Sequence, residues 1–317
     1  PKPIWWLILN GIILNIRPKK SAAKYASVWM AEGSPLKVHT ERQTQFLAGH
    51  LGERGHHLTV TSAMRYGAPS VPAVLDRLKA AGVTKILLLP MYPQYSASTT
   101  ATVIDEACRW LLTQRNQPEM RFVRNFHDDP TYIQALAQTV LDHWMKHGRL
   151  AAGDQLIISF HGLPRRNLDL GDPYYCECMK TGRLLAERLN LGPEQHRICF
   201  QSRFGKAEWL QPYTAPTLEA LAKAGTGRVD VICPGFVADC LETLEEIAME
   251  GKVSFMGHGG REFHYIPALN ENQGWLNALT SIVERHLGGW PSQEKADPDA
   301  LAATARLQPE PCLHSAQ

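Results

Sequence analysis

From residue 55 onward, short apolar runs rich in β-branched residues alternate with segments whose apolar positions recur every three to four residues. Short apolar runs predict buried strands, and the wider spacing predicts amphipathic helices. Their alternation is typical of a parallel sheet covered by helices. The predicted strands cover residues 58–64, 85–89, 121–125, 155–160, 197–201 and 229–232, and the predicted helices cover 70–81, 99–114, 131–146, 179–189, 215–224, 240–250 and 273–287.

A weak internal repeat indicates two similar halves. The segment AMRYGAPS…LKAAGVTKILLLPMYP resembles FQSRFGKAEW…LAKAGTGRVDVICPGF, because in both an Arg-aromatic-Gly follows a strand and a helix ends in Ala-Gly. The predicted fold class is therefore α/β, with two Rossmann-like domains whose parallel sheets are flanked by helices and face each other across a cleft. The predicted domains are residues 1–127 and 128–272, followed by a helix at 273–287 that packs back on the first half and a flexible tail at 288–317.

Charge and composition narrow the functional classes. The chain has 317 residues, 44% of them apolar, with 33 basic and 31 acidic side chains, which give a formal net charge of +2. This is enough apolar material for one large or two medium globular domains. The mixed charges form no basic stripe, so we expect no nucleic-acid partner.

The 7 cysteines are odd in number and scattered. That arrangement is unlike the dense disulfide framework of a small secreted domain, and it favours a reducing, cytoplasmic compartment. Cys176 and Cys178 form the only close pair. A lone CxC lacks the second pair of a zinc or iron-sulfur site, so both are interpreted as buried or incidental thiols.

The most apolar segment, residues 3–16, ends in the basic residues Arg17, Lys19 and Lys20. It is shorter than the roughly 20 residues that a membrane-spanning helix needs, and it lacks the features of a signal peptide. Two interpretations stay open. In the first, the segment touches the surface of the inner membrane or lines an apolar pocket. In the second, it is a core helix with a basic end.

His161 is the first candidate for chemistry at the strand ends, where ligands bind in parallel α/β sheets. It directly follows the apolar run LIISF and precedes Gly162, which predicts a position at a strand tip. A histidine there can exchange a proton or bind a metal near neutral pH. From these residues alone, a purely structural histidine is an equally open interpretation.

An acidic run follows the last predicted strand. Glu242, Glu246 and Glu250 are spaced four residues apart, and Asp239 lies just before them. On an α-helix this spacing places the three glutamates on one face. Carboxylate oxygens bind ferrous iron loosely, which favours delivery over storage, although a solvated acidic face explains the run equally well.

Aromatic and basic side chains near the same strand ends would suit a flat substrate that carries carboxylates. No Walker A, GxSxG, HExxH or GxGxxG motif occurs in a suitable place, so phosphate, acyl-transfer, zincin and dinucleotide chemistry lack support. The aromatic candidates are Tyr92, Tyr95, Phe204, Trp209 and Tyr213, and the cationic candidates are Arg17, Lys20 and Arg65.

Five strings, PMYPQYSAST, SFHGLPRR, GDPYYCECMKT, FQSRFGKAEWLQPYT and CPGFVADCLETLEEIA, closely resemble the ferrochelatase family. They occur in the family's order, and the resemblance runs from the opening Trp-Trp pair to about residue 287. It implies the two-domain class II chelatase plan and an enzyme that inserts ferrous iron into protoporphyrin IX to make protohaem. Porphyrin and ferrous iron would then be its partners, and iron would be a substrate rather than a resident cofactor.

The resemblance also implies roles for particular residues. His161 matches the histidine that binds metal and accepts pyrrole protons, and Glu242 matches its partner across the cleft. Asp239 and Glu246 match acidic positions of a proton or metal path. The remaining matches are the pocket residues Tyr25, Arg65, Tyr95 and Trp209, together with Arg17 and Lys20 near the propionates.

Two departures from the family pattern affect these expectations. The family usually has a first strand and a glycine-containing loop before the Trp-Trp pair, which this sequence does not contain. The C-terminal region offers only Cys312, so we expect no iron-sulfur cluster. A chelatase for cobalt or another tetrapyrrole, a coproporphyrin ferrochelatase and a non-catalytic tetrapyrrole carrier stay open, as does the oligomeric state.

Overall fold

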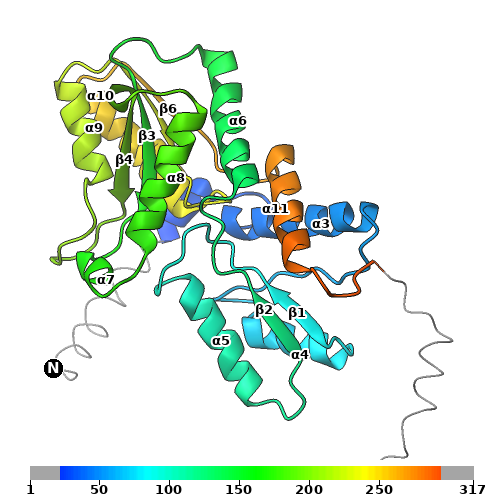
Figure 1. Cartoon of the computed structure of the whole chain (residues 1–317). Helices are drawn as coiled ribbons and strands as arrows, with labels where there is room; N and C mark the ends of the chain where they lie inside the picture. Colours follow the sequence, from blue (N-terminus) through cyan, green and yellow to red (C-terminus); the bar gives the residue numbers. More distant parts are fainter. Residues whose placement is uncertain (1–21, 294–317) are drawn as a thin grey trace, which may run out of the picture.

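The computed structural model describes residues 22–293, in which parallel strands form two separate sheets surrounded by helices (Figure 1). The smaller sheet pairs β1 (Lys85–Leu88) with β2 (Glu119–Phe122). The larger sheet has the order β4-β3-β5-β6, and every pair in it is parallel. Its strands are β3 (Gln155–His161), β4 (His196–Gln201), β5 (Arg228–Ile232) and β6 (Glu262–Tyr265).

Helices connect and cover these strands in the alternating pattern that the sequence predicts. The helices are α3 (Pro35–Glu53), α4 (Val71–Ala80), α5 (Thr100–Leu112), α6 (Pro130–His147), α7 (Arg165–Asp169), α8 (Tyr174–Arg188), the 3-10 turn η2 (Pro193–Gln195), α9 (Thr214–Lys223), the π-helix η3 (Glu242–Gly251), α10 (Lys252–Gly257) and α11 (Gln273–His286).

The strand predicted at residues 58–64 is absent from the described part of the chain, which corrects that prediction. Residues 58–64 have no strand conformation, and Met64 forms only an isolated bridge with Ser70. Its apolar residues still pack, since Leu58 and Val60 lie against the main core. A strand needs a hydrogen-bonded neighbour, and among residues 22–293 no other segment forms a ladder with this one.

Alternate residues of β3 face opposite layers, as expected for a sheet covered on both sides. Leu156, Ile158 and Phe160 belong to the core that contains α6, α8 and α11, whereas Ile157 belongs to the core that contains α9 and α10. β3 therefore lies in a dry interior, and its C-terminal end is where the chain can present polar groups.

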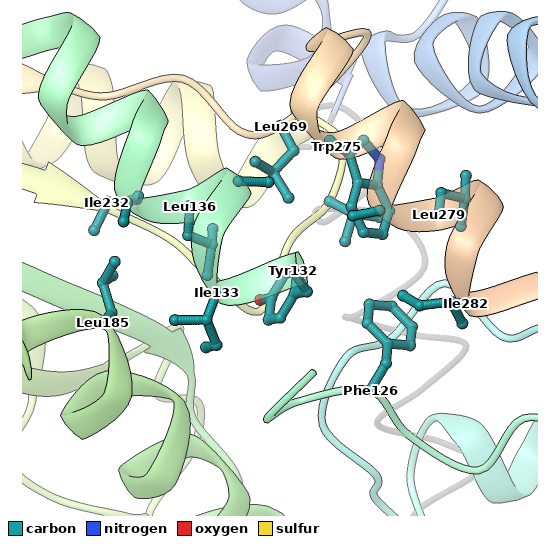
Figure 2. Packing of buried hydrophobic residues seen from close by; sticks show 14 of the residues in the cluster. Phe126, Tyr132, Ile133, Leu136, Leu185, Ile232, Leu269, Trp275, Leu279 and Ile282 are labelled. Carbon is teal, nitrogen blue, oxygen red and sulfur yellow. The ribbon is translucent and has the colours of Figure 1, made fainter. Parts of the chain in front are cut away.

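Helix α11 contacts both α3 and α6, far apart in sequence (Figure 1). Its buried Trp275 stacks on Phe126, with ring centroids 5.8 Å apart, and meets Tyr132 edge-on at 6.0 Å (Figure 2). Phe126 precedes α6, and Tyr132 lies in its first turn. This aromatic cluster ties the C-terminal helix to the segment between the two sheets. The division at residues 127 and 272 stays a prediction.

Candidate active site

The carboxyl ends of β3 and β4 meet at His161 and Gln201, which are the last residues of their strands and are paired in the ladder. The chain then turns at Gly162, whose backbone N–H donates to the Gln201 carbonyl at 2.8 Å. A Cβ at Gly162 would lie 2.7 Å from that carbonyl oxygen and 3.1 Å from the Trp209 ring. Only glycine permits this close approach, so the sequence His-Gly fixes the strand tip.

The His161 imidazole has a defined orientation. Its Nδ1 lies 2.7 Å from the Gly162 carbonyl oxygen, and the Tyr174 hydroxyl donates to the His161 carbonyl at 2.9 Å. A carbonyl oxygen can only accept, so Nδ1 carries the proton. In the neutral ring Nε2 then holds the lone pair, which is the form that accepts a proton or binds a metal.

Glu242 begins the π-helix η3, and Gln201 connects it to the His161 strand tip. The Gln201 side-chain amide donates to the Glu242 carbonyl oxygen at 2.8 Å, while its own carbonyl oxygen accepts from Ser159 at 2.8 Å. The Phe236 ring, from the loop between β5 and η3, lies 6.4 Å from the His161 ring. His161 and the start of the acidic helix thus lie together at the carboxyl end of the sheet.

The acidic run forms a π-helix, not the α-helix that its spacing indicates. A π-helix repeats through i to i+5 hydrogen bonds and occurs often at functional sites. Lys24 contacts Glu245 at 2.8 Å and Glu250 at 2.9 Å, two residues that are five positions apart. Glu246 instead accepts from the Ser202 backbone N–H at 2.6 Å and hydroxyl at 2.5 Å. Glu246 therefore faces β4, and Glu250 faces Lys24.

Asp239 is buried just before the π-helix, and both of its carboxylate oxygens accept hydrogen bonds. The Tyr265 hydroxyl donates at 2.6 Å and Thr243 at 2.8 Å to one oxygen, and the Asn270 amide donates at 2.7 Å to the other. Burial, followed by the negative charge of Asp239, raises the pKa of Tyr265 well above its usual value. The tyrosine therefore stays protonated and holds the carboxylate in place.

Tyr25 lies near Glu242, on the exposed surface next to the candidate site. Its ring meets Trp29 edge-on at 6.2 Å, and both side chains are largely exposed. Partial burial raises the Tyr25 pKa, and the negative charge of Glu242 raises it further. The two exposed aromatic rings offer an apolar contact surface next to the acidic helix of the candidate site.

Arg65 and Tyr95 belong to the half that contains β1 and β2. The Arg65 guanidinium donates to the Thr102 carbonyl at 3.0 Å and lies 3.6 Å from Glu106 of α5. Tyr95 lies in the loop after β1, where the Arg124 guanidinium covers its ring at 4.2 Å. Arg65 is thus held within its own half of the chain, whereas the Tyr95 backbone N–H also donates to Glu177 of the other half at 2.7 Å.

Trp209 packs against the Gly162 turn and forms an isolated bridge with Pro164. It also borders a cavity of about 300 Å³ together with Arg165, Leu168 and Tyr175. Trp209 is thus adjacent to the His161 strand tip. Arg17 and Lys20, expected near the substrate carboxylates, lie outside the described residues.

Gln201 and Ser202 are site residues that the sequence pattern alone does not single out. Both occur within FQSRFG, at the end of a predicted strand, which is the signal that marks His161. Ser202 has a φ of +63°, a left-handed conformation that is uncommon for residues other than glycine. This turn points its backbone N–H and hydroxyl at Glu246, a contact that depends on two elements far apart in sequence.

Comparison with known proteins identifies the family. A family model described as Ferrochelatase matches residues 1–287. The chain is 71% identical over 306 residues to a ferrochelatase of Dechloromonas aromatica strain RCB, which covers 96% of this chain and 83% of that protein. It is 61% identical over 307 residues to a ferrochelatase of Aromatoleum aromaticum, with the same coverage of both chains. The chain belongs to the ferrochelatase family. The resemblance expected from the five strings is confirmed.

Solved structures support the fold that this family membership implies. The chain is similar to SirB from Bacillus subtilis with Fe3+, with a TM-score of 0.58 at 14% sequence identity, over 84% of this chain and 96% of that one. The predicted α/β class with helix-flanked parallel sheets is confirmed. In the part of the chain between residues 22 and 293, no helix is both long enough and apolar enough to cross a bilayer.

Proposed function

We propose that this protein is a ferrochelatase that inserts ferrous iron into protoporphyrin IX to form protohaem. The observation that carries the proposal is the family match over residues 1–287, which contain a histidine at a strand tip with its Nε2 lone pair available. Glu242 follows on an acidic helix that Gln201 links to the same strand end. A base and carboxylates at one sheet edge are what proton removal and metal transfer require.

The reaction needs two pyrrole N–H protons to leave as two negatively charged ring nitrogens bind the iron. The flat ring must also bend, so that its nitrogen lone pairs become accessible. A rigid site that binds the bent ring more tightly than the flat ring lowers the barrier. In this proposal His161 Nε2 and the Glu242 carboxylate first bind the incoming metal. As the metal passes to the macrocycle, the freed Nε2 lone pair accepts one pyrrole proton and the Glu242 carboxylate accepts the other. Glu246 and Asp239 extend the path for protons or metal.

Binding of the macrocycle is assigned to the aromatic and basic side chains around this edge. The exposed ring of Tyr25 and the indole of Trp209 offer apolar contact surface. Arg65 and Tyr95 contribute from the other half, and Arg17 with Lys20 would pair with the propionates. The proposed substrate-binding residues thus come from both halves of the chain.

Anaerobic metallation with ferrous iron, followed by the loss of protoporphyrin fluorescence, tests this function. We expect turnover by the parent protein and a loss of at least about 100-fold in His161→Ala, because general-base catalysis contributes about 10²–10⁴-fold. His196→Ala is the matched control. His196 begins the neighbouring strand at the opposite end of the sheet and also contacts a backbone carbonyl through Nδ1, at 2.9 Å.

The alternatives predict different results in the same assay. A carrier would bind porphyrin without turnover in the parent and the variant, and this outcome would refute the proposal. Faster turnover of coproporphyrin, or of cobalt with another tetrapyrrole, would assign the chain to a different chelatase. A protoporphyrin ferrochelatase should prefer protoporphyrin and ferrous iron over these pairs.

Three further expectations belong to this proposal. Iron acts as substrate, with no resident cofactor and no iron-sulfur cluster, and Cys312 lies outside the described residues. A cytoplasmic location with peripheral membrane contact through residues 3–16 stays a prediction, because that segment also lies outside them. The division into halves at residues 1–127 and 128–272 likewise stays a prediction, as do the helix at 273–287 that packs back on the first half and the flexible tail.

A further inference from the structure

A cluster of three histidines and a buried aspartate lies on the α6 face of the larger sheet, away from the candidate active site. Asp230 is on β5 and pairs with Leu156, five residues before His161 on β3. Five residues of a parallel strand span roughly 16 Å. His143 and His147 come from α6, and His264 comes from β6. None of these side chains takes part in the proposed reaction.

The potential ligand atoms of the cluster converge on one point. His143 Nε2 and His264 Nδ1 are 3.0 Å apart. The nearest Asp230 oxygens are 3.3 Å from His264 Nδ1 and 3.8 Å from His143 Nε2. The ring of His147, one helical turn after His143, has its centroid 4.4 Å from that of His143 and 4.6 Å from that of His264. Two elements, α6 and β6, thus bring three imidazoles to one place, and β5 adds the Asp230 carboxylate.

We propose that His143, His264 and Asp230, with His147 at the rim, form a binding site for one divalent transition-metal ion such as Zn²⁺. One ligand atom from each of His143, Asp230 and His264 can be chosen so that all three lie within 4.8 Å of one another. Two imidazole nitrogens bound to Zn²⁺ at about 2.0–2.1 Å lie at most about 4 Å apart, a range that includes the observed 3.0 Å. Imidazole ligands favour zinc, copper, nickel and iron over magnesium or calcium.

The surroundings of His264 orient its lone pair into the cluster. His264 Nε2 lies 2.9 Å from a Glu262 carboxylate oxygen, which can only accept, so Nε2 carries the proton. The lone pair of the neutral ring is then on Nδ1, the atom that faces His143 and Asp230. A carboxylate that holds the outer nitrogen of a histidine ligand is a recurrent feature of metal sites.

A simple hydrogen-bonded cluster around Asp230 does not require these histidines. Arg228 already pairs with Asp230, with contacts of 2.8 and 2.9 Å, and the Trp144 indole donates to it at 2.8 Å. Neutral imidazole is the form that binds metal. Because Arg228 already neutralises the Asp230 carboxylate, the imidazoles would be the main ligands of the metal ion.

Zinc binding to the full chain, measured by titration calorimetry, tests the site. The background is the double variant His161→Ala, Glu242→Gln, which removes the other proposed metal ligands. We expect this protein to bind one Zn²⁺ per chain and to show a higher Tm with Zn²⁺ than without it. His264→Gln in this background should weaken binding by at least about tenfold. His258→Gln is the control, because His258 lies at the end of α10 and contacts the Ser254 carbonyl.

His147→Gln provides a second test, since His147 is exposed and its replacement should leave the fold intact. It should weaken zinc binding by less than His264→Gln, but measurably against the His258→Gln control. Absence of zinc binding in the background protein would refute the site, and so would equal affinity in His264→Gln, His147→Gln and the control. Iron insertion does not enter this test, so its outcome is independent of the proposed function.

Discussion

Gln201 is the residue on which the geometry of the candidate site depends. It ends β4 beside His161, donates to the Glu242 carbonyl oxygen and accepts from Ser159. An amide is well suited to this position because one side chain offers both donors and an acceptor. Its role is positioning rather than chemistry, since its side chain bonds to Ser159 and to the Glu242 backbone.

Replacing Gln201 with leucine should lower both stability and metallation. The change leaves buried polar groups without a partner, which costs about 1–3 kcal/mol in the free energy of unfolding. Gln155→Leu is the matched control, because Gln155 is a buried glutamine at the other end of β3 that accepts from Arg197. Urea unfolding should show losses for both variants, and fluorescence-based metallation should fall only for Gln201→Leu. Equal turnover in the two variants would contradict the positioning role.

Gly162→Ala should disturb the strand tip directly. The new methyl group would lie 2.7 Å from the Gln201 carbonyl oxygen, so the backbone after His161 must shift. Overpacking of this kind costs about 1–3 kcal/mol, and here it also displaces the carbonyl that fixes the His161 tautomer. Gly257→Ala has open space around the added methyl and serves as the control. We expect metallation rates to fall for Gly162→Ala and to stay at the parent value for Gly257→Ala.

The helices and strands differ in how far the sequence predicts them. The apolar run of β3 predicts that strand well, because a strand buried on both faces needs no alternation, and the β-branched residues of β5 predict that strand although Asp230 interrupts them. The strand β6 was not predicted, since only Phe263 of its four residues is buried and its strand character comes from pairing with β5. Helix α3 was also missed; its buried positions include the polar Gln43, which donates to the Val237 and Asn270 carbonyls.

The π-helix shows what local sequence cannot specify. The spacing of Glu242, Glu246 and Glu250 predicts an α-helix. The contacts that accompany the wider helix come from Gln201, Ser202 and Lys24, which belong to distant segments. His161 and Glu242 were predictable as candidates, while their connection through β4 depends on the tertiary structure.

The register of the π-helix predicts unequal coupling of Lys24 to its two partners. Glu245 is nearly buried, with 11% of its side chain exposed, whereas Glu250 is 56% exposed. Exposed ion pairs contribute about 0.2–1 kcal/mol. Double-mutant cycles with Lys24→Gln should give a larger coupling to Glu245→Gln than to Glu250→Gln. Equal couplings would contradict the burial argument.

The same pair predicts a dependence on alkaline pH. The hydrogen bond to Glu245 is the largest cause that raises the Lys24 pKa above its usual value of 10.5. A group whose pKa is higher in the folded than in the unfolded state stabilises the folded state. This stabilisation is fully present below the pKa of the unfolded state and is lost as the pH rises through the pKa of the folded state. The stability difference between the parent and Lys24→Gln should thus be constant below about pH 10 and shrink above it. Unfolding measured by circular dichroism at each pH checks this.

At the scale of the whole molecule, two acidic residues near the start of α8 hold the β1 loop of the other half. Glu177 accepts from the Tyr95 backbone N–H and the Asn125 amide, both at 2.7 Å. Asp172 accepts from the Ala97 backbone N–H at 2.8 Å and from the Ser96 hydroxyl at 2.9 Å. These contacts fix the loop that carries Tyr95 relative to the sheet that carries His161. The porphyrin site proposed above uses residues of both halves, and this connection would hold its two sides in place relative to each other.

Glu177→Gln tests this connection while keeping the size of the side chain. Both Glu177 oxygens accept hydrogen bonds, so an amide, which has one acceptor, must turn an N–H toward the Tyr95 N–H or the Asn125 amide. We expect a loss of about 1–3 kcal/mol in unfolding free energy and a higher KM for porphyrin. The KM for iron should stay the same, because the iron ligands proposed here lie on the other half. Glu187→Gln, on the exposed end of the same helix, should change neither value. If Glu177→Gln loses stability but keeps the parent KM for porphyrin, the loop is tied down for folding alone and Tyr95 does not contact the substrate.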